Sequence, residues 1–174
     1  MPFRKYMHVE KFGNDEVEVI ELGDCYVFPK LDGTNASIWW DDESFSISCG
    51  SRKRVVTVGD DNAGFAQYVY GNQAIESLSA NYPHWNIYGE WLVPHSLKTY
   101  SDDAWRKFYI FDIWDNENNE YVAYDDYKEV LDVFGVNYIP PLCVVRNTTY
   151  DNLLVELENN WFLIRDGEGA VQGS

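Results

Sequence analysis

The sequence predicts an α+β domain built on antiparallel sheet. Many short apolar stretches alternate with polar residues and are joined by short turns, which is typical of strands that follow one another in a sheet. A few stretches with helical spacing lie between them, and this combination favours helices packed on an antiparallel sheet. At 174 residues the chain has the size of one domain and can bury a substantial core.

Seven stretches are predicted to be strands because they are short, apolar or alternating, and bounded by turn residues. In chain order they are residues 25–28, 36–39, 45–49, 86–93, 108–114, 161–164 and 170–171. Asp32 and Gly33 lie between the first two strands and form the strongest short hairpin signal, so we expect these strands to pair. The last two are expected to be buried and to flank a turn at residues 165–169.

Three stretches are predicted to be helices because apolar residues recur at intervals of three or four. They are residues 62–79, 127–134 and 150–157. Gly71 weakens the first prediction. The second helix is expected to stop at Gly135, and the third to begin behind the candidate caps Thr148 and Thr149.

The chain is strongly acidic. Its net charge is −16, from 13 Lys and Arg residues against 29 Asp and Glu residues. Such a surface repels nucleic acid as a whole, so any contact with a polynucleotide must be local. Aromatic residues make up 17% of the chain, and their rings can fill a core or stack on a base.

Cysteine and histidine do not indicate a disulfide framework or a metal site. The three cysteines are far apart and form no Cys-x-x-Cys pair, so we expect reduced thiols in a cytoplasmic protein. The three histidines lack the spacing of a histidine metal site. No stretch approaches the roughly 18 apolar residues of a membrane span, and the first residues lack the apolar run of a signal peptide, so no membrane contact is expected.

Lys30 is the most informative residue, because it follows an apolar stretch and lies just before the turn at Asp32 and Gly33. A lysine amine is a poor nucleophile while it is protonated, and desolvation or a nearby positive charge such as a metal ion releases its lone pair. The apolar strand end can supply desolvation, and Asp32 can help to hold a metal ion. Alternatively, Lys30 is an ordinary surface lysine before a turn.

Five short motifs follow one another along the chain. They are Lys30-Leu31-Asp32-Gly33-Thr34-Asn35, Ser51-Arg52, Tyr88-Gly89-Glu90-Trp91, Tyr109-Ile110-Phe111-Asp112-Ile113 and Gly167-Glu168-Gly169-Ala170-Val171. In this order the motifs resemble those of the covalent nucleotidyltransferases, the superfamily of ATP-dependent DNA ligases, RNA ligases and messenger-RNA capping enzymes. The Thr34-Asn35 pair and the opening Phe3-Arg4-Lys5-Tyr6 are most similar to RNA ligases of the phage type.

The resemblance implies an antiparallel-sheet nucleotidyltransferase core of the ATP-grasp-like kind, with residues 1–174 forming a single adenylyltransferase domain. Lys30 would attack the α-phosphorus of ATP, expel pyrophosphate and carry AMP as a phosphoramidate. Arg52 would contact the nucleotide or the end being joined, since its planar fork suits phosphate and hydroxyl oxygens. Glu90 would accept hydrogen bonds from the ribose hydroxyls. Phe111 would stack on the adenine, with Asp112 beside it.

The resemblance also implies a divalent cation, Mg²⁺ or Mn²⁺. Glu168 would bind it, largely through water, and Asp32 is the second candidate for the metal shell or for orienting Lys30. Magnesium prefers oxygen ligands and keeps several waters, so one or two carboxylates suffice. The cation would neutralise phosphate charge and help Lys30 to lose its proton. Asn35 is assigned to the substrate or to the metal-water network.

Three of these residues also have ordinary structural explanations. Arg52 fits a solvated arginine in a turn, Glu90 fits an outward carboxylate on a half-exposed strand, and Phe111 fits a core position. The order of the motifs favours the functional interpretation, because each motif falls where a strand end or a turn is predicted.

In the family, AMP next passes to the 5′-phosphate of a nucleic acid, and a 3′-hydroxyl then attacks that phosphate and releases AMP. The implied partner is therefore an RNA end, nicked or single-stranded, in RNA repair. The superfamily carries a further lysine-bearing strand after the Glu-Gly motif and a downstream domain, but no lysine follows Lys128. Either the chain is truncated, or it finds these charges elsewhere, or it binds without turnover. With a net charge of −16 we expect this chain alone to bind RNA weakly.

Two other functions remain compatible with the motifs. The first is a degenerate nucleotide-binding or interaction module that keeps the fold and has lost turnover. The second is a guanylyltransferase of the capping kind, which shares Lys-x-Asp-Gly, although the Thr34-Asn35 pair argues against it.

Overall fold

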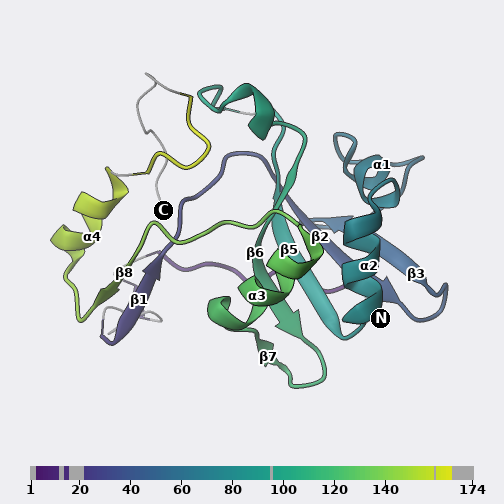
Figure 1. Cartoon of the computed structure of the whole chain (residues 1–174), viewed down its shortest axis with the longest axis horizontal. Helices are drawn as coiled ribbons and strands as arrows, with labels where there is room; N and C mark the ends of the chain where they lie inside the picture. Colours follow the sequence, from purple (N-terminus) through teal and green to yellow (C-terminus); the bar gives the residue numbers. More distant parts are fainter. Residues whose placement is uncertain (1–2, 12–13, 16–21, 95, 159, 166–174) are drawn as a thin grey trace. The chain divides into compact units, whose positions relative to one another are not determined.

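The computed structural model describes residues 3–11, 14–15, 22–94, 96–158 and 160–165 (Figure 1). The chain divides into two compact units, each assembled from separate stretches of sequence. The first, here called the sheet unit, comprises Met1–Tyr6, Gly33–His95 and Arg106–Tyr138. The second, here called the Lys30 unit, comprises Met7–Asp32, Ser96–Trp105 and Ile139–Ser174.

The sheet unit contains a six-stranded antiparallel sheet with the strand order β4-β3-β2-β5-β6-β7. Its strands are β2 (Thr34–Asp41), β3 (Ser46–Ser51), β4 (Val55–Val56), β5 (Trp85–Trp91), β6 (Phe108–Asp115) and β7 (Glu120–Tyr121). The central strands β2 and β5 pair along most of their length, from Thr34 opposite Trp91 to Trp39 opposite Asn86. The predicted α+β class with an antiparallel sheet is confirmed.

Three helices and one face of this sheet share a hydrophobic core. The helices are α1 (Phe65–Tyr70), α2 (Gln73–Asn81) and α3 (Tyr124–Phe134) (Figure 1). Ile38, Ile87 and Ile113 enter the core from β2, β5 and β6, and all three are fully buried. Leu78 of α2 and Leu131 of α3 are fully buried against them. Burial of this much apolar surface is the main force that holds the unit together.

The opposite face of the sheet carries the N-terminal segment. Trp39, Tyr88 and Trp114 each directly follow a core isoleucine in their strands, so they lie on this face. The ring of Phe3 lies 5.6 Å from that of Trp39, and the Arg4 guanidinium lies 3.7 Å from the centroid of the Trp114 ring. The Tyr88 hydroxyl donates to the Arg4 carbonyl at 3.2 Å. Residues 3–6 are therefore part of the sheet unit, because aromatic and backbone contacts fix them there.

The Lys30 unit is built on a two-stranded antiparallel sheet of β1 (Asp24–Val27) and β8 (Cys143–Arg146), which lie side by side in Figure 1. It also contains the 3₁₀ turn η2 (Asp102–Ala104) and helix α4 (Tyr150–Leu157). The Thr149 side chain caps α4 by accepting a hydrogen bond from the Asn152 amide, as the sequence predicts. No helix in the described part of the chain is long and apolar enough to span a membrane.

The expected hairpin between residues 25–28 and 36–39 is wrong. β1 pairs with β8, whereas β2 pairs with β3 and β5. Pro29 follows β1 and has no N–H for a ladder, and it is buried, so the chain leaves the strand there instead of turning back. The partner of β1 comes from the stretch Cys143–Arg146, which is not predicted to be a strand.

The other elements agree with the sequence to differing degrees. The expected strands at 36–39, 45–49, 86–93 and 108–114 are confirmed as β2, β3, β5 and β6. The helical stretch 62–79 divides into α1 and α2 at Gly71, and the Asn72 side chain caps α2 by accepting from the Ile75 amide.

The predicted helices at 127–134 and 150–157 are confirmed as α3 and α4, and α3 begins earlier, at Tyr124. The expected buried strand at 161–164 is wrong, because Trp161 is 56% exposed and only Ile164 forms an isolated bridge, with Tyr100. The expected strand at 170–171 lies outside the described residues.

Candidate active site

Lys30 lies in the loop that joins β1 to β2, and its side chain is exposed. Its neighbours Pro29 and Leu31 are both buried, and Leu31 is only 4% exposed. These buried neighbours anchor the backbone on each side of Lys30, while the amine remains accessible. The structure does not provide the dry strand end that the sequence suggests for Lys30, since β1 ends at Val27.

Asp32 fixes this loop to the segment around Tyr100 within the Lys30 unit. The Asp32 amide donates to the Tyr100 hydroxyl at 2.8 Å, and the Asp32 carboxylate accepts from the Leu97 amide at 2.7 Å. Tyr100 is fully buried, and its ring meets that of Trp105 edge-on at 5.2 Å. Asp32 therefore has a clear positioning role for the loop of Lys30.

The same segment holds the last described residues of the chain. The Ser101 amide donates to the Leu163 carbonyl and the Arg165 amide donates to the Thr99 carbonyl, both at 2.8 Å. Tyr100 thus contacts the loop of Lys30 through its hydroxyl and forms an isolated bridge with Ile164. The predicted metal ligand Glu168 lies outside the described residues, three positions beyond Arg165 in the sequence.

In the sheet unit, the Gly33 amide donates to the Glu90 carboxylate at 3.0 Å. A Cβ atom on Gly33 would lie 2.4 Å from the Trp91 carbonyl oxygen, so this position accommodates only glycine without movement of the backbone. Asn35 pairs with Glu90 in the ladder between β2 and β5. The glycine of Lys-x-Asp-Gly is thus explained by close approach to β5 and not by a hairpin turn. The bond from Gly33 joins the first predicted motif to the third.

A β-bulge separates Glu90 from the expected adenine contact. Tyr88 of β5 pairs with Asp112 of β6, whereas Gly89 pairs with Ile110, so Phe111 is the extra residue of the bulge. Such a bulge re-aims the neighbouring side chains. Gly89 is required at this point, because a Cβ atom there would lie 2.5 Å from the Phe108 ring and 2.6 Å from the Tyr109 carbonyl oxygen. The glycine in this motif thus allows the backbones of β5 and β6 to approach each other closely.

Phe111 and Asp112 both contact Tyr6, a residue for which no role is predicted from the sequence. The Tyr6 ring meets the Phe111 ring edge-on at 5.1 Å, and the Tyr6 hydroxyl donates to the Asp112 carboxylate at 3.0 Å. Phe111 is half-buried and lies outside the hydrophobic core cluster. The only sequence signal for Tyr6 is its place in the opening Phe3-Arg4-Lys5-Tyr6, which resembles phage-type RNA ligases.

The Asp112 carboxyl group has a pKa raised to about 6. Burial is the main cause, and the hydrogen bonds from the Tyr6 hydroxyl and the Ile113 amide partly oppose it. Burial, followed by the nearby Asp112 charge, raises the pKa of Tyr6 above its usual range. Tyr6 therefore acts as a neutral hydrogen-bond donor to Asp112.

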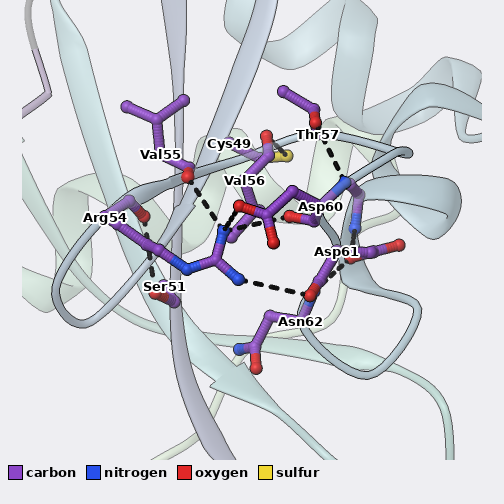
Figure 2. A network of polar contacts seen from close by, with 10 residues as sticks. Cys49, Ser51, Arg54, Val55, Val56, Thr57, Asp60, Asp61 and Asn62 are labelled. Carbon is purple, nitrogen blue, oxygen red and sulfur yellow. Dashed lines mark hydrogen bonds and ion pairs between the residues drawn. The ribbon is translucent and has the colours of Figure 1, made fainter.

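Arg52 is exposed in the turn that follows β3. The last residue of β3, Ser51, pairs with Ala36, so Arg52 is the first residue beyond the ladder, at the level where Asn35 pairs with Glu90. No hydrogen bond or ion pair joins Arg52 to another residue in the described part of the chain. Arg54 lies in the same turn as Arg52, but its guanidinium is held by polar contacts to Asp60 (Figure 2).

The described residues contain no group of three or more His, Cys, Asp or Glu side chains that could hold a metal ion. Of the two predicted metal ligands, Asp32 is described and Glu168 is not. A Mg²⁺ or Mn²⁺ ion needs only one or two protein carboxylates when phosphate oxygens and water complete its shell. The Asp32 carboxylate, two residues from Lys30, offers oxygen of the required kind. The metal site remains a prediction.

Comparison with protein families matches residues 23–171 to the family described as RNA ligase. This chain belongs to the RNA ligase family. The match begins next to β1 and includes the Lys30, Glu90 and Phe111 motifs. The comparison with curated protein sequences gives no match.

Solved structures of RNA ligases share the fold. An archaeal ATP-dependent RNA ligase has a TM-score of 0.69 and 15% identity, covering 90% of this chain and 41% of the archaeal one. A mutant Naegleria gruberi RNA ligase with ATP and manganese has a TM-score of 0.68 and 18% identity, covering 98% of this chain and 56% of that one. Another mutant of the Naegleria gruberi enzyme with ATP and manganese has a TM-score of 0.59 and 21% identity, with 80% and 42% covered. The chain thus spans about half, or less, of the length of these structures.

Proposed function

We propose that the chain is an ATP-dependent adenylyltransferase of the RNA ligase type, with Lys30 as the nucleophile. The observation that carries this proposal is the bond from the Gly33 amide to the Glu90 carboxylate in a chain of the RNA ligase family. It joins the glycine of Lys-x-Asp-Gly to the carboxylate expected at the ribose. The family match includes stretches of both compact units, which supports assigning both to the same RNA ligase sequence.

The reaction is a nucleotidyl transfer to nitrogen. The neutral Nζ of Lys30 attacks the α-phosphorus of ATP, a P–N bond forms, and the P–O bond to the β-phosphate breaks. Pyrophosphate leaves with the bonding electron pair, and the proton of the amine passes to solvent. Lys30 is exposed in the structure, so its amine is accessible to ATP. In this proposal, positive charge at the phosphates releases its lone pair.

Each remaining site residue has one task in this proposal. Glu90, oriented by the Gly33 amide, accepts hydrogen bonds from ribose hydroxyls. Phe111 stacks on the adenine. The Tyr6 ring packs edge-on against Phe111, and Asp112 fixes Tyr6 by accepting a hydrogen bond from its hydroxyl. Arg52 contacts the nucleotide or the RNA end with its exposed guanidinium.

A divalent cation fits the oxygen donors of this site. Asp32 and Glu168 would hold it, and Asn35 would contact its water or the substrate. When bound, it would neutralise phosphate charge and so favour attack by the neutral amine. Two of the similar RNA ligases are seen with ATP and manganese, which supports the choice of nucleotide and of a divalent ion.

We further propose that AMP passes from Lys30 to the 5′-phosphate of an RNA, nicked or single-stranded, and that a 3′-hydroxyl then displaces it. Family membership supports this assignment. The net charge of −16 supports weak binding of RNA by this chain alone, with contacts confined to local cations such as Arg52.

Covalent labelling tests the proposal. The chain is incubated with ATP labelled in the α-phosphate and Mg²⁺, and then separated under denaturing conditions. We expect a label on the wild type and none on Lys30→Ala, because alanine has no amine to form the P–N bond. Lys11→Ala, which removes another exposed lysine of the same unit, should keep the label.

Three outcomes would contradict the proposal. A label that persists in Lys30→Ala would mean that a different residue is the nucleophile. Reversible ATP binding without any label would identify a nucleotide-binding module. Preferential labelling by GTP would identify a guanylyltransferase.

A further inference from the structure

The loop Asp60–Ala63, here called the clamp loop, contacts the ends of both strands that present Gly33 and Glu90. The Asn62 side-chain amide donates to the Thr34 hydroxyl at 3.2 Å, and the Trp91 indole N–H donates to the Ala63 carbonyl at 3.0 Å. Thr34 and Trp91 pair with each other at the end of the ladder. They are the immediate neighbours of Gly33 and Glu90 in the sequence. The clamp loop therefore joins the two strands beside the bond between Gly33 and Glu90.

Arg54 holds the clamp loop at one end, through the contacts drawn in Figure 2. Its Nη1 donates to the Asp60 carboxylate at 2.7 Å and to the Asp60 carbonyl at 3.0 Å, and its Nη2 donates to the Asp61 carbonyl at 3.4 Å. The Arg54 carbonyl accepts from the Ser51 amide at 2.8 Å, so the backbone of Arg54 is itself fixed to the end of β3. The guanidinium presents several donors in one rigid plane, which suits binding to several oxygens of one loop.

Asp61 holds the other end of the clamp loop. Its carboxylate accepts from the amides of Asn62, Ala66 and Gln67 at 2.6, 2.8 and 3.1 Å. Two of these amides belong to the first turn of α1, where no helical carbonyl is available to them. With one end fixed by Arg54 and the other by α1, the loop can hold Asn62 and Ala63 against the strands.

The exposure of Arg54 indicates that its effect is local. The side chains of Arg54 and Asp60 are 45% and 76% exposed, and ion pairs with such exposure contribute little to global stability. The position of a loop is a separate matter, since three contacts from one guanidinium to oxygens of Asp60 and Asp61 determine where the clamp loop lies. Loss of Arg54 should therefore loosen the clamp loop and leave the fold intact.

We propose that Arg54 is a positioning residue of the nucleotide site. It acts through the clamp loop on Thr34 and Trp91, and through them on the Gly33 and Glu90 pair. This inference rests on the proposed function, in which Glu90 binds the ribose. Arg54 itself does not contact the nucleotide, because its guanidinium is committed to Asp60 and Asp61.

The test compares Arg54→Ala and Arg54→Lys with Lys53→Ala in the adenylylation reaction. A misplaced Glu90 weakens ATP binding in the ground state and the transition state alike, so KM rises and the maximal rate changes little. For Arg54→Ala we expect the KM for ATP to rise about tenfold, with the maximal rate within about threefold of wild type. Arg54→Lys keeps one contact to Asp60 and should recover part of this loss. Lys53→Ala removes a neighbouring exposed cation from the same turn and should match wild type.

A second variant separates positioning from a direct contact with ATP. Asn62→Ala removes the bond to Thr34 and leaves the contacts of Arg54 in place. If Arg54 acts through the clamp loop, Asn62→Ala should raise KM similarly, and the double variant should be no worse than Arg54→Ala. Additive effects of the two changes would overturn the inference. An unchanged KM in Arg54→Ala would also overturn the inference. So would a lower maximal rate at unchanged KM, which is the result expected from loss of folded protein.

Hydrogen exchange at the Gly33 amide makes the test independent of catalysis. We expect this amide to exchange several-fold faster in Arg54→Ala than in wild type or Lys53→Ala. If wild type takes no label from ATP, the proposed function fails, and this readout still decides whether Arg54 positions Gly33. Equal exchange in all three proteins would mean that Arg54 has no such role.

Discussion

Asp112 shows how a single half-buried group connects the N-terminal segment to the predicted adenine contact. Its carboxylate accepts from Tyr6, whose ring also meets Phe111. Burial raises the Asp112 pKa from 3.8 to about 6, so the folded state holds the proton more tightly than the unfolded state does. The stabilising effect of this proton is fully present below pH 3.8 and is lost as the pH rises through about 6.

We therefore predict that the stability of Asp112→Asn, relative to that of wild type, increases as the pH rises from 4 to 7. Asparagine has no charge to bury, so the cost that wild type incurs on ionisation is absent. The difference in unfolding free energy should move by about 2 to 3 kcal/mol in favour of the variant over this range. Urea unfolding at several pH values measures it. A difference that is constant with pH would show that Asp112 titrates normally.

Tyr6→Phe is the matched control for this titration. It removes the hydrogen bond that lowers the Asp112 pKa and keeps the ring against Phe111. The carboxyl pKa, followed by NMR, should therefore rise further in Tyr6→Phe. A fall in the pKa would show that the hydroxyl of Tyr6 is not the donor that Asp112 uses.

At the scale of elements, the entry into β2 depends on its close approach to β5. A Cβ atom on Gly33 would lie 2.4 Å from the Trp91 carbonyl oxygen, which belongs to the backbone and cannot rotate away. We predict that Gly33→Ala lowers the free energy of unfolding by about 2 kcal/mol, as overpacking against a fixed neighbour does. Gly59→Ala is the control, since nothing lies within 4 Å of the Cβ atom that it would add. Denaturant unfolding compares the two, and equal stabilities would contradict the close approach.

Local sequence patterns predict individual strands, whereas contacts between distant strands cannot be predicted from them. Local patterns located β2, β5 and β6, because each of them alternates between the core and the opposite face. The pairing of β1 with Cys143–Arg146 could not be predicted in this way, since it joins residues more than a hundred positions apart. The Asp32-Gly33 signal was misleading because the glycine serves a close contact with Trp91 in place of a turn.

The motifs single out residues that the structure brings together, while the roles of these residues at a nucleotide stay predictions. Gly33 and Glu90 belong to separate motifs, and the structure joins them directly. Tyr6, Tyr100 and Asn62 were not predicted, because each acts through one long-range hydrogen bond that leaves no local pattern. The bulge at Phe111 was equally hidden, since it exists only in the register between β5 and β6.

At the scale of the whole molecule, the net charge of −16 sets the conditions under which RNA can approach. A polyanion is repelled by the average surface and attracted only by local cations such as the exposed Arg52. Salt screens the long-range repulsion more than the short-range attraction, because the Debye length falls from about 30 Å at 0.01 M to about 10 Å at 0.1 M. The long-range repulsion weakens first, while a contact at a few ångströms persists.

We predict that the association rate with a 5′-phosphorylated RNA rises as salt increases over this range, the reverse of what a basic RNA-binding protein shows. The equilibrium constant for RNA binding should still depend on local contacts. In a plot of the logarithm of this constant against the logarithm of salt concentration, Arg52→Ala should change the slope by about 1. Stopped-flow fluorescence with a labelled RNA measures the rate, and titration measures the slope. A rate that falls steadily with salt would contradict this prediction. It would mean that RNA is attracted to a concentrated basic surface near Arg52, despite the acidic charge of the chain as a whole.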